Sequence, residues 1–196
     1  MKPKRVHYWS GLILALFAGF HLLNHLAVLS GPEAHLATME VLRKVYRNLV
    51  VEWMLLVAVF LQIATGLRQA YQKGLKQAGW AKYQVWSGLY LAVFFLIHVS
   101  AVMMGRFVLK VDTNLYFGAA GLNIFPFNLF FVPYYSLAIM AFFTHIASIH
   151  AQKSKAIGAA NQAKIIVAIG LITTILIVLG MTDFARGLFI PPTYKF

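Results

Sequence analysis

Apolar residues dominate five stretches of this chain, and polar or charged residues separate one stretch from the next. The stretches cover residues 9–29, 49–67, 85–104, 129–149 and 165–181. A membrane-spanning helix needs roughly 20 predominantly apolar residues to cross about 30 Å of hydrocarbon, and each stretch comes close to that length. The pattern therefore predicts an all-α integral membrane protein with five transmembrane helices. Residues 1–196 form a single transmembrane domain, which leaves no room for a separate soluble domain.

A different periodicity follows the first stretch. After the Ser30-Gly31-Pro32 turn, apolar residues recur every three or four positions, as at Leu36 and Met39. This spacing places them on one side of a helix, so we expect residues 33–46 to form a short amphipathic helix on the outer membrane surface. Residues 105–128, which contain glycine, proline and several aromatic residues, are expected to form an ordered outer loop that dips toward the lipid headgroups.

Charge supports the membrane assignment and gives it a direction. The chain is 61% hydrophobic and 11% charged, with a net charge of +12, whereas about 25% of residues are charged in soluble domains. With a cytoplasmic N-terminus, all five acidic residues fall outside. The inside segments then hold Lys2, Lys4, Arg5, Arg68, Lys73, Lys76, Lys82, Lys153, Lys155 and Lys164. The positive-inside rule favours this topology, so we expect a multi-pass protein of the inner (cytoplasmic) membrane, contacting lipid and not nucleic acid, with its C-terminus outside.

The beginning of the chain and its lack of cysteine limit the alternatives further. MKPKR before an apolar run resembles a secretory signal peptide, but two histidines and an asparagine within that run favour a retained helix. The absence of cysteine excludes disulfides, a cysteine-ligated iron–sulfur cluster and a thiolate haem ligand within this chain.

Four histidines lie inside the apolar stretches: His21, His25, His98 and His145. An ionisable residue at such depth indicates a functional site, and imidazole is a common haem ligand. Counting from the inner helix ends, His25 lies roughly 24 Å deep, His21 roughly 18 Å and His98 roughly 20 Å. The first and third helices therefore present imidazoles at one level, where they either clamp a haem iron or hydrogen-bond between helices. His21 and His25 share a helix face; one binds iron, and the other bonds to a propionate, a quinone or a neighbouring helix.

The inner half of the bundle offers a weaker site. His145 lies roughly 6 Å from the inner end of the fourth helix, and Gln62 of the second helix lies roughly 7.5 Å deep. Either these two side chains hydrogen-bond to each other, or His145 alone ligates a second haem with an open sixth position. His7 and His150 at the inner interface, and His35 on the outer surface helix, are expected at headgroup level.

Arg68 stands near Gln62 and His145 at the inner end, together with Lys73 and Lys76. These cations either bind a haem propionate, a quinone head or an acidic partner, or they only set the topology.

Several segments resemble the five-helix cytochrome b membrane anchor of succinate dehydrogenases and fumarate reductases, especially its single-polypeptide type. The segments are GFHLLNHL, SGPEAHLATME, VEWMLL, LQIATGL, WSGLYLAVFFLIHV and FFTHIASI, and together they extend over roughly residues 5–150. The resemblance implies that His25 and His98 ligate an outer haem. It implies an inner haem on the second and fourth helices, where His145 matches one ligand but Gln62, a poor iron ligand, occupies the other position.

The resemblance implies a respiratory-chain b-type cytochrome that transfers electrons between a partner subunit and a quinone. It implies one bound haem b and leaves open whether a second haem is bound. It also places flavoprotein and iron–sulfur partner subunits on the cytoplasmic side. The sequence contains no catalytic nucleophile, carboxylate dyad or phosphate loop, so the chain is at most an electron-transfer subunit of an oxidoreductase complex. Two alternatives remain: a stand-alone haem-binding membrane protein (sensor, carrier or reductase), or a structural membrane subunit without cofactors.

Overall fold

The structure, a computed structural model, describes residues 3–182 and 187–195, and this part of the chain is helical and contains no strand. Five of its helices are long and apolar enough to cross a membrane. They are α1 (Pro3–Leu26), α3 (Leu49–Lys73), α4 (Gly79–Met103), α6 (Asn128–Lys153) and α7 (Ala159–Met181). The prediction of an all-α chain with five candidate membrane spans is therefore confirmed.

All five of these helices are longer than the apolar stretches that predicted them. Polar residues continue a helix beyond the hydrocarbon because the backbone hydrogen bonds do not depend on apolar side chains. Helix α3 shows how such an end is fixed. The Asn48 side chain accepts a hydrogen bond of 3.1 Å from the Val50 N–H, which caps the first turn. At the other end, Gly74 has a φ of 75° and ends the helix.

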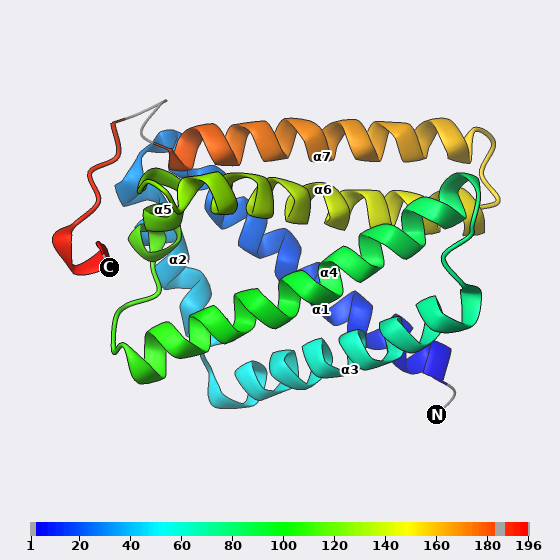
Figure 1. The fold of residues 1–196 in the computed structure, drawn as a ribbon, viewed down its shortest axis with the longest axis horizontal. Coiled ribbons are helices and arrows are strands. Elements are labelled where there is room, and N and C mark those ends of the chain that lie inside the picture. The colour runs from blue at the N-terminus through cyan, green and yellow to red at the C-terminus, as the bar shows by residue number, and fades with distance from the viewer. Residues whose placement is uncertain (1–2, 183–186, 196) are drawn as a thin grey trace.

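The five long helices form a bundle in which each packs against its neighbours (Figure 1). Helices α6 and α7 run side by side, α4 packs against both α6 and α3, and α1 packs against α3 and approaches α7. Helices α1 and α4 have at most a marginal backbone contact. The interior between α1 and α4 is therefore occupied by side chains, and this is where the histidines of both helices lie.

One end of the bundle, which we call the α2 end, is covered by α2 (Pro32–Tyr46), α5 (Leu115–Asn123) and residues 187–195. The expected surface helix at 33–46 is confirmed in its position along the chain. Residues 105–128 differ from the expected loop, since they contain α5 and the end of a π-helical turn, Met104–Val108. Leu115 and Ala119 of α5 are fully buried, so this apolar segment contributes to the core.

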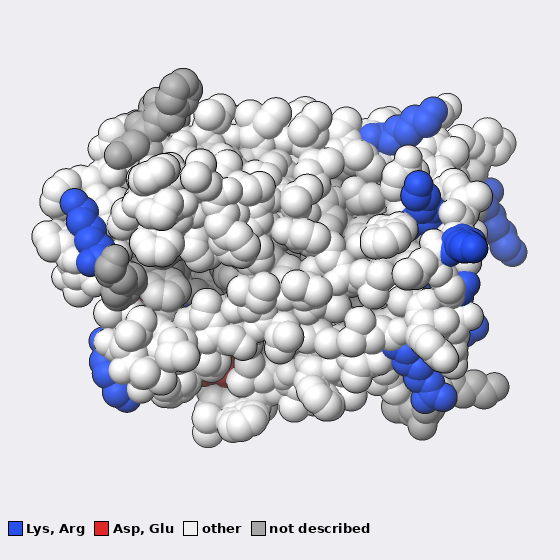
Figure 2. Space-filling model, in the orientation of Figure 1, with Lys and Arg blue, Asp and Glu red and all other residues white. Residues whose placement is uncertain are grey.

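The opposite end, which we call the basic end, comprises the start of α1, the α3–α4 turn and the α6–α7 turn. Lysine and arginine side chains gather there, at the right of Figure 2. The four acidic residues in the described part of the chain, Glu33, Glu40, Glu52 and Asp112, all belong to the α2 end. Lys2 and Asp183, which also entered the topology prediction, lie outside the described residues.

Candidate functional site

A cluster of histidines from three helices lies near the α2 end. His21 and His25 are one turn apart on α1, and their Nε2 atoms are 3.1 Å apart. On its other side, Nδ1 of His25 lies 3.3 Å from Nε2 of His35 on α2. The four-residue spacing on α1 puts both of its imidazoles on one face. Both ring nitrogens of His25 are thus engaged by other imidazoles.

His98 of α4 completes the cluster from the opposite side of the interior. The centroids of the His98 and His21 rings are 6.2 Å apart, with an angle of 65° between the ring planes. Phe94, one turn earlier on α4, stacks on His98 at 5.0 Å. Neither ring nitrogen of His98 has a hydrogen-bond partner among the described residues. An unpaired imidazole in an apolar span is costly, so its nitrogens are available to a ligand.

His35, expected at headgroup level on the surface helix, is buried within the protein. Only 1% of its surface is exposed, and it lies under α2 against α1. Nδ2 of Asn24 is 3.3 Å from its Nε2. Burial, together with the nearby His21 and Arg43 charges, lowers the pKa of His35 to about 4. Its imidazole is therefore neutral at physiological pH, which gives it one N–H donor and one acceptor nitrogen.

The ring separation between His21 and His98 suits two axial ligands of one iron. A metal–imidazole distance of about 2 Å on each side places the two ring centroids roughly 6 Å apart, close to the 6.2 Å observed. The resemblance instead assigns His25 as the ligand from α1. His25 remains a candidate, but the structure brings the rings of His21 and His98 together and occupies both nitrogens of His25.

No group of three or more His, Cys, Asp or Glu residues in the described ranges is arranged to hold a metal ion. A haem iron does not require such a group, because the macrocycle supplies four ligands and the protein only one or two axial ones. The described donors therefore fit an axial imidazole pair better than a bare metal site.

A second polar cluster, between α1 and α3, lies at the basic end. Gln62 donates from Nε2 to Nε2 of His7 at 3.2 Å, and its Oε1 accepts a 2.7 Å hydrogen bond from Ser10. Nδ1 of His7 lies 3.0 Å from the Thr65 hydroxyl. His7, expected at headgroup level, takes part in this network through both ring nitrogens. Gln62 and His7 are both satisfied by protein groups.

His145 lies in the same half of the bundle but belongs to a separate network. Its Nδ1 donates to the backbone carbonyl of Gln84 at 3.1 Å and lies 3.2 Å from the Ser87 hydroxyl. A direct hydrogen bond between His145 and Gln62, one of the two sequence-based alternatives, is therefore absent. Nε2 of His145 has no hydrogen-bond partner among the described residues. An imidazole held through Nδ1–H by a carbonyl is the usual arrangement of a metal-binding histidine.

Arg68 is exposed near the basic end, and the structure gives it no hydrogen bond or ion pair with a described residue. Lys73, by contrast, donates to Oε1 of Gln84 at 2.7 Å. Lys73 therefore links the α3 and α4 ends, while Arg68 remains available to a ligand, a lipid or a partner.

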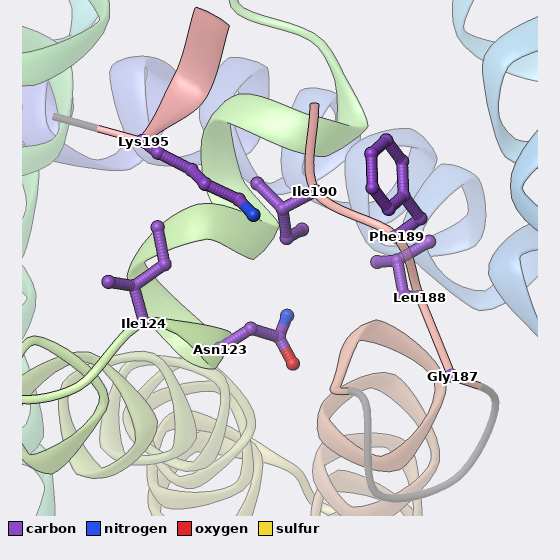
Figure 3. Close-up of a pocket in the computed structure, with 7 residues that line it drawn as sticks. All are labelled: Asn123, Ile124, Gly187, Leu188, Phe189, Ile190 and Lys195. Atoms are coloured by element: carbon purple, nitrogen blue, oxygen red, sulfur yellow. The ribbon is translucent and has the colours of Figure 1, made fainter. Parts of the chain in front are cut away.

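A cavity and a groove in the molecule lie away from the histidine cluster of the α2 end. One is a cavity of about 350 Å³ between the end of α5 and the C-terminal segment. Asn123 and Lys195 line this cavity (Figure 3). The other is an apolar groove of about 590 Å³ between α1 and α3, with Trp9 and Trp53 in its wall. The groove also includes Ser10, the hydroxyl that bonds to Gln62.

Comparison of the chain with protein-family models, curated proteins and solved structures found no match in any of the three. The assignment of function therefore depends on the site itself.

Sequence reasoning identified His21, His25 and His98 but missed His35 and Asn24 as members of the cluster. The sequence spacing could have indicated His35, because it lies four residues before the apolar Met39 and therefore on the same helix face. In the structure both side chains are buried. Asn24 carried a weaker signal, as a polar residue within an apolar stretch.

Proposed function

We propose that this protein is a membrane-embedded b-type cytochrome that binds haem between α1 and α4. The observation that carries the proposal is the pair His98 and His21, whose rings approach from opposite sides at 6.2 Å. His98 has no competing hydrogen bond in the described part of the chain, and Nδ1 of His21 is also unpartnered. Imidazoles from two helices that approach each other inside an apolar bundle, with ring nitrogens not used in hydrogen bonds, suit ligation of a haem iron.

His98 would hold the iron from α4, and an α1 imidazole would hold it from the other side. We favour His21 as the α1 ligand, with His25 and His35 orienting it through hydrogen bonds. Haem supplies one-electron redox chemistry when bound. The surrounding apolar helices exclude water, and Phe94 keeps the His98 ring in place by stacking.

A role in electron transfer between a partner and a quinone follows from the resemblance to the succinate dehydrogenase and fumarate reductase anchors. Two features are consistent with this role. The basic end offers a positively charged surface to an acidic partner. The apolar groove between α1 and α3 reaches the Ser10 hydroxyl, as a binding site for an isoprenoid quinone would require.

Spectroscopy of the purified protein tests this proposal. We expect a Soret band, and a pyridine haemochrome of b type at about one haem per chain. His98→Ala should remove the haem. His150→Ala is the matched control, because His150 is a histidine of the basic end whose Nε2 lies 2.7 Å from Gln162 Oε1. Purified protein without any haem, or a His98→Ala variant that keeps its full spectrum, would overturn the proposal.

A stand-alone haem protein with an open coordination position is the second candidate. It is favoured by the basic end, where Nε2 of His145 is free while Gln62 and His7 are committed to each other. A single imidazole ligand leaves the sixth position of an iron accessible to carbon monoxide. A carbon monoxide difference spectrum that disappears in His145→Ala would support this candidate. Copurification with flavoprotein and iron–sulfur subunits would instead support the anchor role.

A further inference from the structure

The inward face of α2 carries two buried N–H groups without partners. His35, Met39 and Arg43 are spaced four residues apart, so they share this face. Nδ1 of His35 and Nε of Arg43 are both buried and lack a hydrogen-bond partner. A buried donor without an acceptor destabilises the folded protein. Two of them on one face indicate that something else supplies the acceptors.

The hydrogen on His35 is located by its neighbours. Nε2 of His35 receives the Asn24 Nδ2 group at 3.3 Å and also faces Nδ1 of His25 at 3.3 Å. An amide nitrogen only donates, so Nε2 accepts from Asn24, and the tautomer that fits this contact carries its hydrogen on Nδ1. The unpartnered atom of His35 is therefore a donor.

Arg43 adds a charge to this donor pair. Its two Nη atoms donate to the Asp112 carboxylate at 2.8 and 3.1 Å, which leaves Nε–H unused. Arg47 also lies 3.6 Å from the same carboxylate. Two cations thus share one anion, and the nearby Arg106 is paired with Glu52. In this group of ion pairs three arginines face two carboxylates.

Two turns of α2 separate His35 from Arg43, whose guanidinium bonds to Asp112. The charge of Arg43 acts on His35 strongly enough to contribute to its lowered pKa. The two donors therefore share the face of α2 that carries the buried His35 and Met39.

We propose that His35 and Arg43 form a carboxylate-binding site at the α2 end, in which each donates one hydrogen bond to a carboxylate. One source of the carboxylates is the haem, through its two propionates, and in that case the inference rests on the proposed function. The other source is a small soluble carboxylate that enters from the α2 end. N–H donors near a surplus positive charge prefer a carboxylate to a neutral acceptor.

Haem and its dimethyl ester, in which both propionates are blocked, distinguish this site from general haem binding. Cofactor-free protein is titrated with each and followed by the Soret band. The wild-type protein should bind haem about tenfold more tightly than the ester, since a charge-assisted hydrogen bond typically contributes this much. Arg43→Met and His35→Phe should each reduce the preference to about threefold or less. Lys44→Met is the matched control, because it removes one positive charge from the exposed side of the same helix.

Each outcome has a separate meaning. Wild-type protein that binds neither compound contradicts the proposed function. Binding of both with equal affinity, or an unchanged preference in Arg43→Met, overturns the carboxylate site alone. His35→Phe also removes a contact to His25. If His35→Phe misfolds for this reason, the result with Arg43→Met alone tests the carboxylate site. If the site binds a small soluble carboxylate, sodium acetate should raise the thermal midpoint of the cofactor-free wild-type protein relative to sodium chloride at equal ionic strength. It should not raise the midpoint of Arg43→Met. Absence of that shift, with the ester preference intact, assigns the site to the propionates.

Discussion

Histidines at the two ends of the bundle differ in their hydrogen bonding, as His98 at the α2 end and His7 at the basic end show. At the α2 end, His21, His25 and His35 contact one another, and His98 faces them without a hydrogen bond to any described residue. At the basic end, His7 is enclosed by Gln62 and Thr65. Both groups of residues are polar side chains inside an apolar bundle, but only the first brings two imidazoles with unpartnered nitrogens, His21 and His98, within 6.2 Å of each other. At the basic end the unpartnered Nε2 of His145 has no such neighbour in the described part of the chain.

This difference shows why a buried histidine is not sufficient evidence for a cofactor. His7 is explained by its neighbours, since an interhelical hydrogen bond satisfies each of its ring nitrogens. For His98, no residue of the described ranges 3–182 and 187–195 supplies such a hydrogen bond. Accounting for each ring nitrogen therefore separates histidines that stabilise packing from those available to a ligand.

The largest expected effect concerns the two α1 histidines. His21→Ala should abolish the low-spin spectrum of a haem with two imidazole ligands, because it removes the ring that faces His98. His25→Ala should retain that spectrum and lower haem affinity about 10- to 100-fold, as loss of a residue that orients a ligand does. Electron paramagnetic resonance and haem titration of both variants measure the difference. The reverse outcome would assign the ligand to His25.

A smaller effect is expected at the basic end. Gln62→Ala should reduce stability by about 1–3 kcal/mol, because it leaves Nε2 of His7 without its partner, whereas the Ser10 hydroxyl keeps its bond to the Val6 carbonyl. The haem spectrum should be unchanged, since Gln62 belongs to the other cluster. Unfolding in a denaturing detergent measures the stability. A changed Soret band in this variant would show that the two ends are not independent.

The prediction of five helices succeeded because the length of an apolar stretch alone decides whether it can cross a bilayer. The membrane level shared by the α1 and α4 histidines followed from the constant rise of a helix. Neither inference required knowledge of which helices pack together.

Partners of individual side chains were harder to predict, because they depend on how the helices rotate and cross. Gln62 and His145 lie at similar depths, but Gln62 turns toward α1 and His145 toward α4. The burial of His35 depends on α2 folding back over α1, which a local pattern does not encode.

The smallest expected effect concerns the ion pair that ties α2 to residues 109–114. Burial on its own raises the pKa of Asp112, but the hydrogen bond and charge of Arg43, with the charge of Arg47, hold it below its usual value. A carboxylate with a lowered pKa stabilises the fold above its unfolded-state pKa, and this contribution is lost as the pH falls through the folded-state value. Asp112 is half exposed, so Asp112→Asn should cost about 0.2–1 kcal/mol at neutral pH. The cost should vanish in acid, and unfolding curves at several pH values test this.

The central claim is that haem is held between α1 and α4 by His98 and a histidine of α1. Haem counted per chain, in wild-type protein and in His98→Ala purified side by side, tests it most directly. The account predicts about one low-spin haem b per chain in the wild type and none in the variant. Equal haem content in the two proteins, or none in the wild type, would contradict it.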